Sequence, residues 1–192
     1  MAARNKPAAR SRGIKIEWDM RMSNESRNEE AQAGAATSAL DPESQREIRE
    51  RVTQLAFGGD SQQFDEFVRV LSEATPDGVE VILRGSAVTG HKWGSDEPFD
   101  ADGQGTSDLD VTFVGGDMVT LFHEFHIPGI HSVPLSEEHP FASSALLPLR
   151  KRLCAMTKRP VNLQATTSLV QSVRDATMDQ PYLVLLKKPK DE

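Results

Sequence analysis

Val79-Glu-Val-Ile-Leu-Arg-Gly-Ser86 is an apolar, β-branched run that ends in a Gly-Ser pair. A second run of this kind, Ser107-Asp-Leu-Asp-Val-Thr-Phe-Val114, follows after a polar interval. Both runs have the length and composition of buried strands. Side chains two apart on a strand point to the same face, so Asp108 and Asp110 should lie side by side. We expect the two strands to be neighbours, with Ser86 facing these carboxylates.

Two adjacent carboxylates repel one another unless a cation lies between them. Mg²⁺ is the natural candidate for Asp108 and Asp110, because it takes hard oxygen ligands and keeps sites for phosphate oxygens. The alternative is an exposed acidic strand end beside a turn. The Gly-Ser pair favours the metal site. Gly85 lets the backbone pass close to a ligand, and Ser86 offers a hydroxyl and an amide where the strand turns into a helix.

Taken together, these residues resemble the nucleotidyltransferase superfamily that includes DNA polymerase beta. The resemblance rests on a hydrophobic strand, a Gly-Ser pair, an interval and an Asp-x-Asp strand, within residues 79–166. The family implies an α+β fold with a mixed β-sheet flanked by helices. It also implies a nucleoside triphosphate on Gly85 and Ser86, Mg²⁺ on Asp108 and Asp110, and transfer of a nucleotidyl group with loss of pyrophosphate.

The sequence departs from the family pattern in two places. Residues 87–107 form a longer interval than is usual, which predicts a polar loop over the site; Lys92 could contact phosphate there and Trp93 could stack on a base. The family places a third carboxylate on a later strand, and the matching strand here carries Asn162 instead. An amide coordinates metal weakly and cannot act as a general base. The site is therefore either a transferase with two acids or a module that binds without catalysis.

The rest of the chain predicts a tail followed by one domain. Residues 1–40 are polar without sustained periodicity and should form a flexible, disordered tail, with a strand at 13–18 as an alternative. Asp41-Pro42 should begin the first helix of a domain that continues to residue 192. The further predicted elements are a helix from Ser61, helices over 118–125, 142–156 (kinked near Pro148) and 168–178, a strand over 160–165, and an apolar segment of ambiguous type over 182–186.

Other motifs in the sequence are weaker. Residues 85–92 resemble a P-loop, but the lysine is one position late. Residues 100–111 resemble a calcium loop that lacks its final glutamate. The histidines within 123–139 lack the spacing of a metalloprotease and favour surface or packing roles. Arg150–Arg152 is interpreted as a solvated helix face, and Cys154 as an inert packed thiol.

Composition restricts the function further. The chain has 192 residues and a formal net charge of −7, and an acidic protein is repelled by phosphate backbones, which disfavours general nucleic-acid binding. No apolar run reaches the length of a membrane span and no secretory signal is evident, so the cytoplasm is the expected location. The leading hypothesis is Mg²⁺-dependent transfer of a nucleotide, with AMP favoured, from a triphosphate to an acceptor, for which a partner protein is one candidate. The alternative is a non-catalytic nucleotide-binding or protein-interaction module.

Overall fold

The computed structural model describes residues 41–168 and 180–190. The predicted tail over 1–40 and the strand at 13–18 lie outside the described residues, as does the helix predicted over 168–178 apart from Ser168. No described helix has the length and apolar character needed to cross a membrane.

Two capped helices begin the described part. Helix α2 (Pro42–Phe57) starts after Asp41, whose carboxylate accepts from the Ser44 N–H, and it ends at Gly58 in the left-handed conformation. Helix α3 (Ser61–Ala74) starts after Asp60, whose side chain accepts from two backbone N–H groups of the first turn. Side-chain capping satisfies donors that lack a partner inside the helix. Both predicted starts are therefore confirmed.

The described strands form one mixed sheet. Its strands are β1 (Glu80–Arg84), β2 (Leu109–Val114), β3 (Phe125–Ile127), β4 (His131–Ser132), β5 (Val161–Thr166) and β6 (Leu183–Lys187). They lie in the order β3-β4-β5-β2-β1-β6, with β2 and β5 parallel and the other pairs antiparallel. The three strands predicted from their apolar runs are present, and the ambiguous segment at 182–186 belongs to the edge strand β6.

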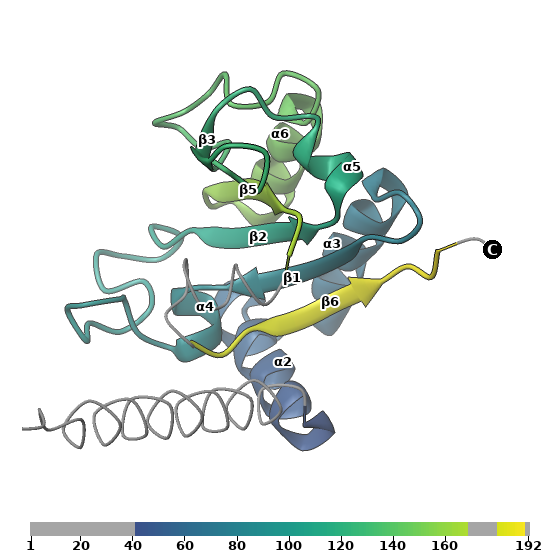
Figure 1. The fold of residues 1–192 in the computed structure, drawn as a ribbon. Coiled ribbons are helices and arrows are strands. Elements are labelled where there is room, and N and C mark those ends of the chain that lie inside the picture. The colour runs from purple at the N-terminus through teal and green to yellow at the C-terminus, as the bar shows by residue number, and fades with distance from the viewer. Residues whose placement is uncertain (1–40, 169–179, 191–192) are drawn as a thin grey trace, which may run out of the picture. The chain divides into compact units, whose positions relative to one another are not determined.

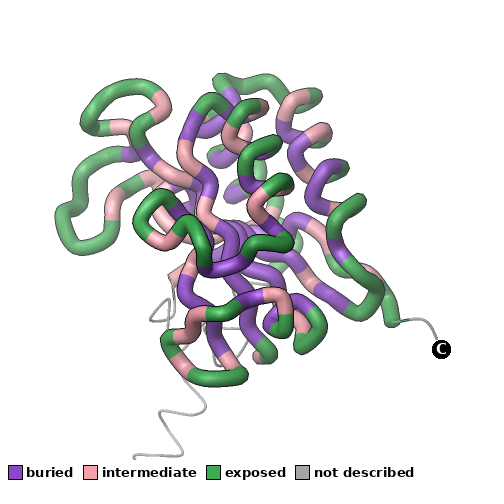
Figure 2. Tube along the Cα trace, turned by 90° about the horizontal axis from the view of Figure 1, so that it is seen from above, coloured by how far each residue is buried: buried purple, intermediate pink, exposed green. Residues whose placement is uncertain are grey.

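Helices α2, α3 and α6 (Leu147–Thr157) cover one face of this sheet (Figure 1). The alternate residues of the central strands, such as Leu83, Val111 and Leu163, are fully buried against them. Figure 2 shows buried residues concentrated in the middle of this unit and exposed ones in the loops. The chain is thus α+β, with a mixed sheet and helices, as the sequence predicts.

Two predicted helices differ from the structure. The segment 118–125 contains only the end of a single helical turn, α5 (Gly116–Val119), and then enters strand β3. The backbone of Leu121 and Phe122 continues in local turn bonds to Met118 and Val119, and from His123, whose N–H donates to the Ala142 carbonyl, it bonds to a distant partner. Helix α6 begins at residue 147, not 142, and Pro148 lies in its first turn, where a missing N–H causes no kink.

Candidate functional site

The site lies on the face of β1, β2 and β5 opposite the helices. Asp110 on β2 pairs in register with Arg84 on β1 and with Asn162 on β5. Asp108 precedes β2 by one residue and shares the face of Asp110. The short helix α4 (Ser86–Thr89) begins directly after β1 and Gly85. The predicted neighbours, the Gly-Ser turn, the aspartates and Asn162, are therefore brought together.

Gly85 cannot be replaced without disturbing an aspartate. Its φ of 83° lies in the left-handed region that favours glycine, and a Cβ built on it would lie 2.7 Å from Asp110 Oδ2. The glycine thus lets the Asp110 carboxylate approach the turn that leads to Ser86. The sequence predicts that the backbone at Gly85 passes close to a ligand, and in the structure the group close to Gly85 is the carboxylate of Asp110.

Asn162 lies between the two carboxylates. Its Nδ2 atom donates to Asp108 Oδ2 at 2.5 Å and to Asp110 Oδ1 at 3.1 Å. The amide hydrogens therefore occupy the position where two carboxylates would otherwise face each other. The Asn162 side chain therefore points into the site and not into the core. The sequence predicts this placement, because Asn162 lies where the nucleotidyltransferase pattern has a third carboxylate.

Asp110 is held in an environment that opposes its ionisation. Burial raises the pKa of Asp110 and the neighbouring Asp108 charge raises it further, while Arg84 and the hydrogen bond from Asn162 act to lower it. Arg84 is oriented by Thr112 and Gln164, with its Nη2 donating to Gln164 Oε1 at 2.6 Å. A group whose ionisation is disfavoured in this way gains from binding a cation.

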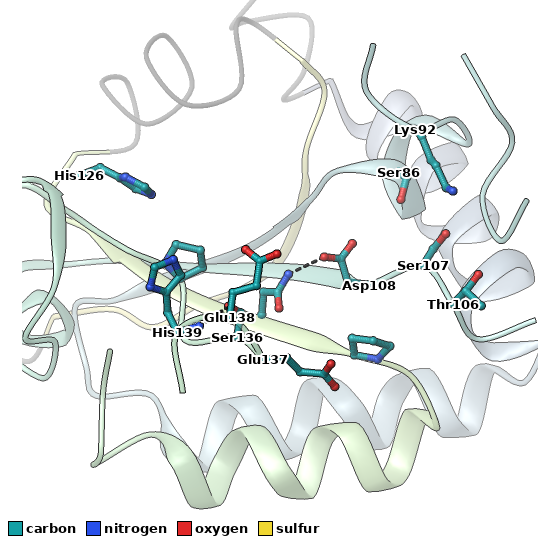
Figure 3. A pocket seen from close by; sticks show the side chains of 13 residues that line it. Ser86, Lys92, Thr106, Ser107, Asp108, His126, Ser136, Glu137, Glu138 and His139 are labelled. Carbon is teal, nitrogen blue, oxygen red and sulfur yellow. Dashed lines mark hydrogen bonds between the residues drawn. The ribbon is translucent and has the colours of Figure 1, made fainter. Parts of the chain in front are cut away.

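A pocket of about 540 Å³ is lined by Asp108 and Asn162 (Figure 3). Ser86 and Lys92 lie toward one end, His126 and His139 lie toward the other, and Asp108 lies between them. The remaining lining residues are Thr106, Ser107, Pro134, Ser136, Glu137, Glu138, Pro160 and Asn162. Ser86, Lys92 and Asp108 thus share one cavity.

Lys92 enters this cavity already paired. Its ammonium donates to the Asp102 carboxylate and lies 3.5 Å from Glu97, and the hydrogen bond to Asp102 is the main reason that the pKa of Lys92 is raised. A phosphate would have to exchange with these exposed carboxylates.

The long interval is anchored by a buried ion pair. Asp100 accepts from the Gly105 and Ser107 amides and from Arg159, whose guanidinium also packs over the Phe99 ring. Burial by itself raises the pKa of Asp100, but these hydrogen bonds and the Arg159 charge together lower it. The loop is therefore fixed at its base, next to Asp108.

Arg150 corrects one prediction from the sequence. The run Arg150–Arg152 was interpreted as a solvated helix face, yet Arg150 is buried and its Nε donates to the Val161 carbonyl at 2.8 Å. The contact is with the residue before Asn162, so this arginine supports the first residue of strand β5. Arg152 is exposed and pairs with Glu73, as a solvated face predicts.

The site offers Mg²⁺ two carboxylates, but its third polar group is an amide and not a third acid. Among residues 41–168 and 180–190, no three His, Cys, Asp or Glu side chains converge as a metal cluster. Asp108 and Asp110 supply hard oxygens, and a half-turn of the Asn162 amide would replace its Nδ2 with Oδ1. The three side chains would then present only oxygens to one point, which fits Mg²⁺.

Sequence reasoning missed the far wall of the pocket. His139 lies there with its Nδ1 atom 3.2 Å from Glu124 Oε2. Its backbone is held at both sides, since its N–H donates to Ser136 Oγ and its carbonyl accepts from the Ala142 N–H. The sequence shows only several histidines among prolines, and no spacing rule connects residue 139 to residue 108. The polar alternation Asn162, Gln164, Thr166 on β5 is a signal that could have marked the polar face.

Comparisons with known proteins add no relative. No family model matches the chain, and neither the curated proteins nor the solved structures contain a match.

Proposed function

We propose that this chain is a nucleotidyltransferase with a fold like that of DNA polymerase beta. It transfers a nucleotide, with AMP favoured, from a triphosphate to an acceptor in the cytoplasm. The observation that carries the proposal is a cluster at one pocket: Ser86, Asp108 and Asn162 line it, and Asp110 lies behind them, against Gly85 and hydrogen-bonded to Asn162. A partner protein is one candidate for the acceptor.

The residues divide into a metal side and a phosphate side. Asp108, Asp110 and the Oδ1 atom of Asn162 would hold Mg²⁺, and Ser86 lies where a phosphate oxygen would bind. When bound, the metal would neutralise charge on the phosphates and on the departing pyrophosphate. The protein contributes mainly position and charge, as is usual in phosphoryl and nucleotidyl transfer.

The acceptor needs a base, which Asn162 cannot supply. His139 lines the opposite wall of the pocket, with its Nδ1 atom 3.2 Å from Glu124 Oε2, and we propose the neutral tautomer in which Nδ1 donates to this carboxylate. The Nε2 lone pair is then available to an acceptor hydroxyl. That oxygen would bond to the α-phosphorus, the bond to the β-phosphate oxygen would break, and the hydroxyl proton would pass to His139.

The proposal is tested with a triphosphate labelled at the α-phosphate. The full chain is incubated with Mg²⁺, labelled ATP and cell extract, and labelled products are separated from AMP and ATP. We expect a labelled acceptor with the wild-type chain and none with Asp108→Asn combined with Asp110→Asn. Equal labelling by both chains would remove the aspartates from the reaction.

One observation favours a second function, a binding module without turnover. Asn162 already donates to both carboxylates, so the aspartates are partly compensated without a metal. Under this alternative the wild-type chain binds Mg²⁺-ATP but labels nothing, and Asn162→Asp gains weak activity. Loss of a positioned base costs about 10²- to 10⁴-fold in rate, so a slow wild-type transferase remains detectable with label.

A further inference from the structure

A second pocket of about 460 Å³ adjoins the site on the side of the long interval. Lys92 lines both pockets, and the single helical turn α4 connects them, because Ser86 borders the first and Thr89 the second. The second pocket is further lined by His91, Trp93 and Gln180. The two pockets are therefore neighbours that share a lining residue.

Trp93 is presented to this pocket in an exposed position. Its exposed fraction is 64%, and Phe141 is the one other large hydrophobic residue exposed to this degree in the described part of the chain. The hairpin that carries it is held at its base, since the Lys92 N–H donates to the Glu97 carbonyl at 2.7 Å and His91 pairs with Pro98. Gly94 turns the tip with a φ of 78°. A fixed backbone thus presents an indole ring to a concave polar surface.

We propose that this second pocket binds the nucleobase of the triphosphate, with the Trp93 ring stacked on the base. The inference rests on the proposed function, which places the phosphates at Ser86, and it adds where the remainder of the nucleotide lies. A flat indole suits a planar base, because every base has a π-face. The imidazole of His91 and the amide of Gln180 offer hydrogen-bonding groups to its edge.

The shape of the pocket favours a small planar ligand over a protein surface. Contiguous exposed apolar patches larger than a few hundred Å² mark protein–protein interaction sites. Here one aromatic ring stands among Thr89, Lys92 and Asp96, which are polar. Lys92 lines both pockets, which suits a single ligand that places its phosphates in the first and its base in the second.

Fluorescence tests this inference, because the chain has two tryptophans, Trp18 and Trp93. In a full chain with Trp18→Phe, emission reports on Trp93 alone. The chain is titrated with Mg²⁺-ATP and, separately, with Mg²⁺ and inorganic tripolyphosphate, which has the phosphates but no base. We expect ATP to quench the emission, and tripolyphosphate to raise the melting temperature without quenching.

Substitution gives the second measurement. Trp93→Ala should weaken Mg²⁺-ATP binding by about 5- to 150-fold, the range that base stacking on an aromatic ring gives, and leave tripolyphosphate binding unchanged. Trp93→Phe should retain part of the affinity. If Trp93→Ala binds ATP as tightly as the wild type while ATP still raises the melting temperature, the base lies elsewhere and only this inference fails. If neither ligand changes emission or melting temperature, the proposed function fails with it.

Discussion

The two faces of strands β1, β2 and β5 differ in polarity and in what covers them, although alternate residues of the same strands form both faces. On one face, Leu83, Val111 and Leu163 are fully buried against helices. On the other, Arg84, Asp110 and Asn162 lie side by side in register. The alternation of side chains along a strand allows this division. Stability and ligand binding should therefore respond to different substitutions on the same strand.

The apolar face should give the largest loss of stability. Phe113→Ala removes a ring with no exposed surface, and such a change typically lowers the free energy of unfolding by about 3 to 5 kcal/mol. Chemical denaturation measures this, with Phe113→Leu as the control that keeps most of the volume. A loss below about 1 kcal/mol, the size of a surface substitution, would contradict the assignment of this face as the core.

The polar face should give the largest loss of ligand response. Mg²⁺-ATP at 100 times its dissociation constant should stabilise the wild-type chain by about 2.7 kcal/mol. Asp108→Asn with Asp110→Asn should abolish that increase and leave a folded protein, because neither carboxylate packs in the core. Thermal unfolding with and without ligand checks this. An undiminished response in the double variant would place the ligand elsewhere.

Asn162→Asp should make the stability of the chain depend on Mg²⁺. Without Mg²⁺, the variant loses the amide hydrogen bonds to two charged partners and gains a third carboxylate, which should lower stability by about 2 kcal/mol. With Mg²⁺ and ATP, the added oxygen ligand should restore the loss and keep or raise turnover. Asn162→Ala is the matched control, which loses the same bonds without adding charge. Lowered stability with an unchanged metal response would separate Asn162 from the metal site.

The free energy of unfolding should fall with rising pH where Asp110 ionises, which is the opposite of the usual effect of an aspartate. The pKa of Asp110 is raised in the folded state, so the folded chain binds the proton more tightly than the unfolded one. Its ionisation therefore lowers stability as pH rises from the ordinary aspartate pKa through the raised value. Without metal, Asp110→Asn should be more stable than the wild type above this window, and the difference should vanish at lower pH. Thermal unfolding across pH 3 to 8 measures it, and a difference that grows on acidification would contradict the shift.

The sequence predicted the strands and the position of the site on them better than it predicted the loops that surround the site. Alternation marks Asp108 and Asp110 locally, and the register of β2 and β5 then carries Asn162 to them. The wall formed by His139 and the anchor between Asp100 and Arg159 depend on contacts between residues far apart in the chain. No local pattern encodes such contacts. For the same reason the helix predicted over 118–125 was wrong, because the His123 N–H donates to the distant Ala142 carbonyl and Phe125 pairs with Ser132, and these contacts override local helix propensity.

An experimental structure of the full chain with Mn²⁺ and a non-hydrolysable ATP analogue tests the account most directly. Mn²⁺ takes the oxygen ligands that Mg²⁺ takes and can be located by its anomalous scattering. We expect the ion between the carboxylates of Asp108 and Asp110, with the Asn162 amide turned to present its oxygen and a phosphate beside Ser86. An analogue bound away from these aspartates, or an Asn162 amide that still donates to both carboxylates in the complex, would contradict the proposed site.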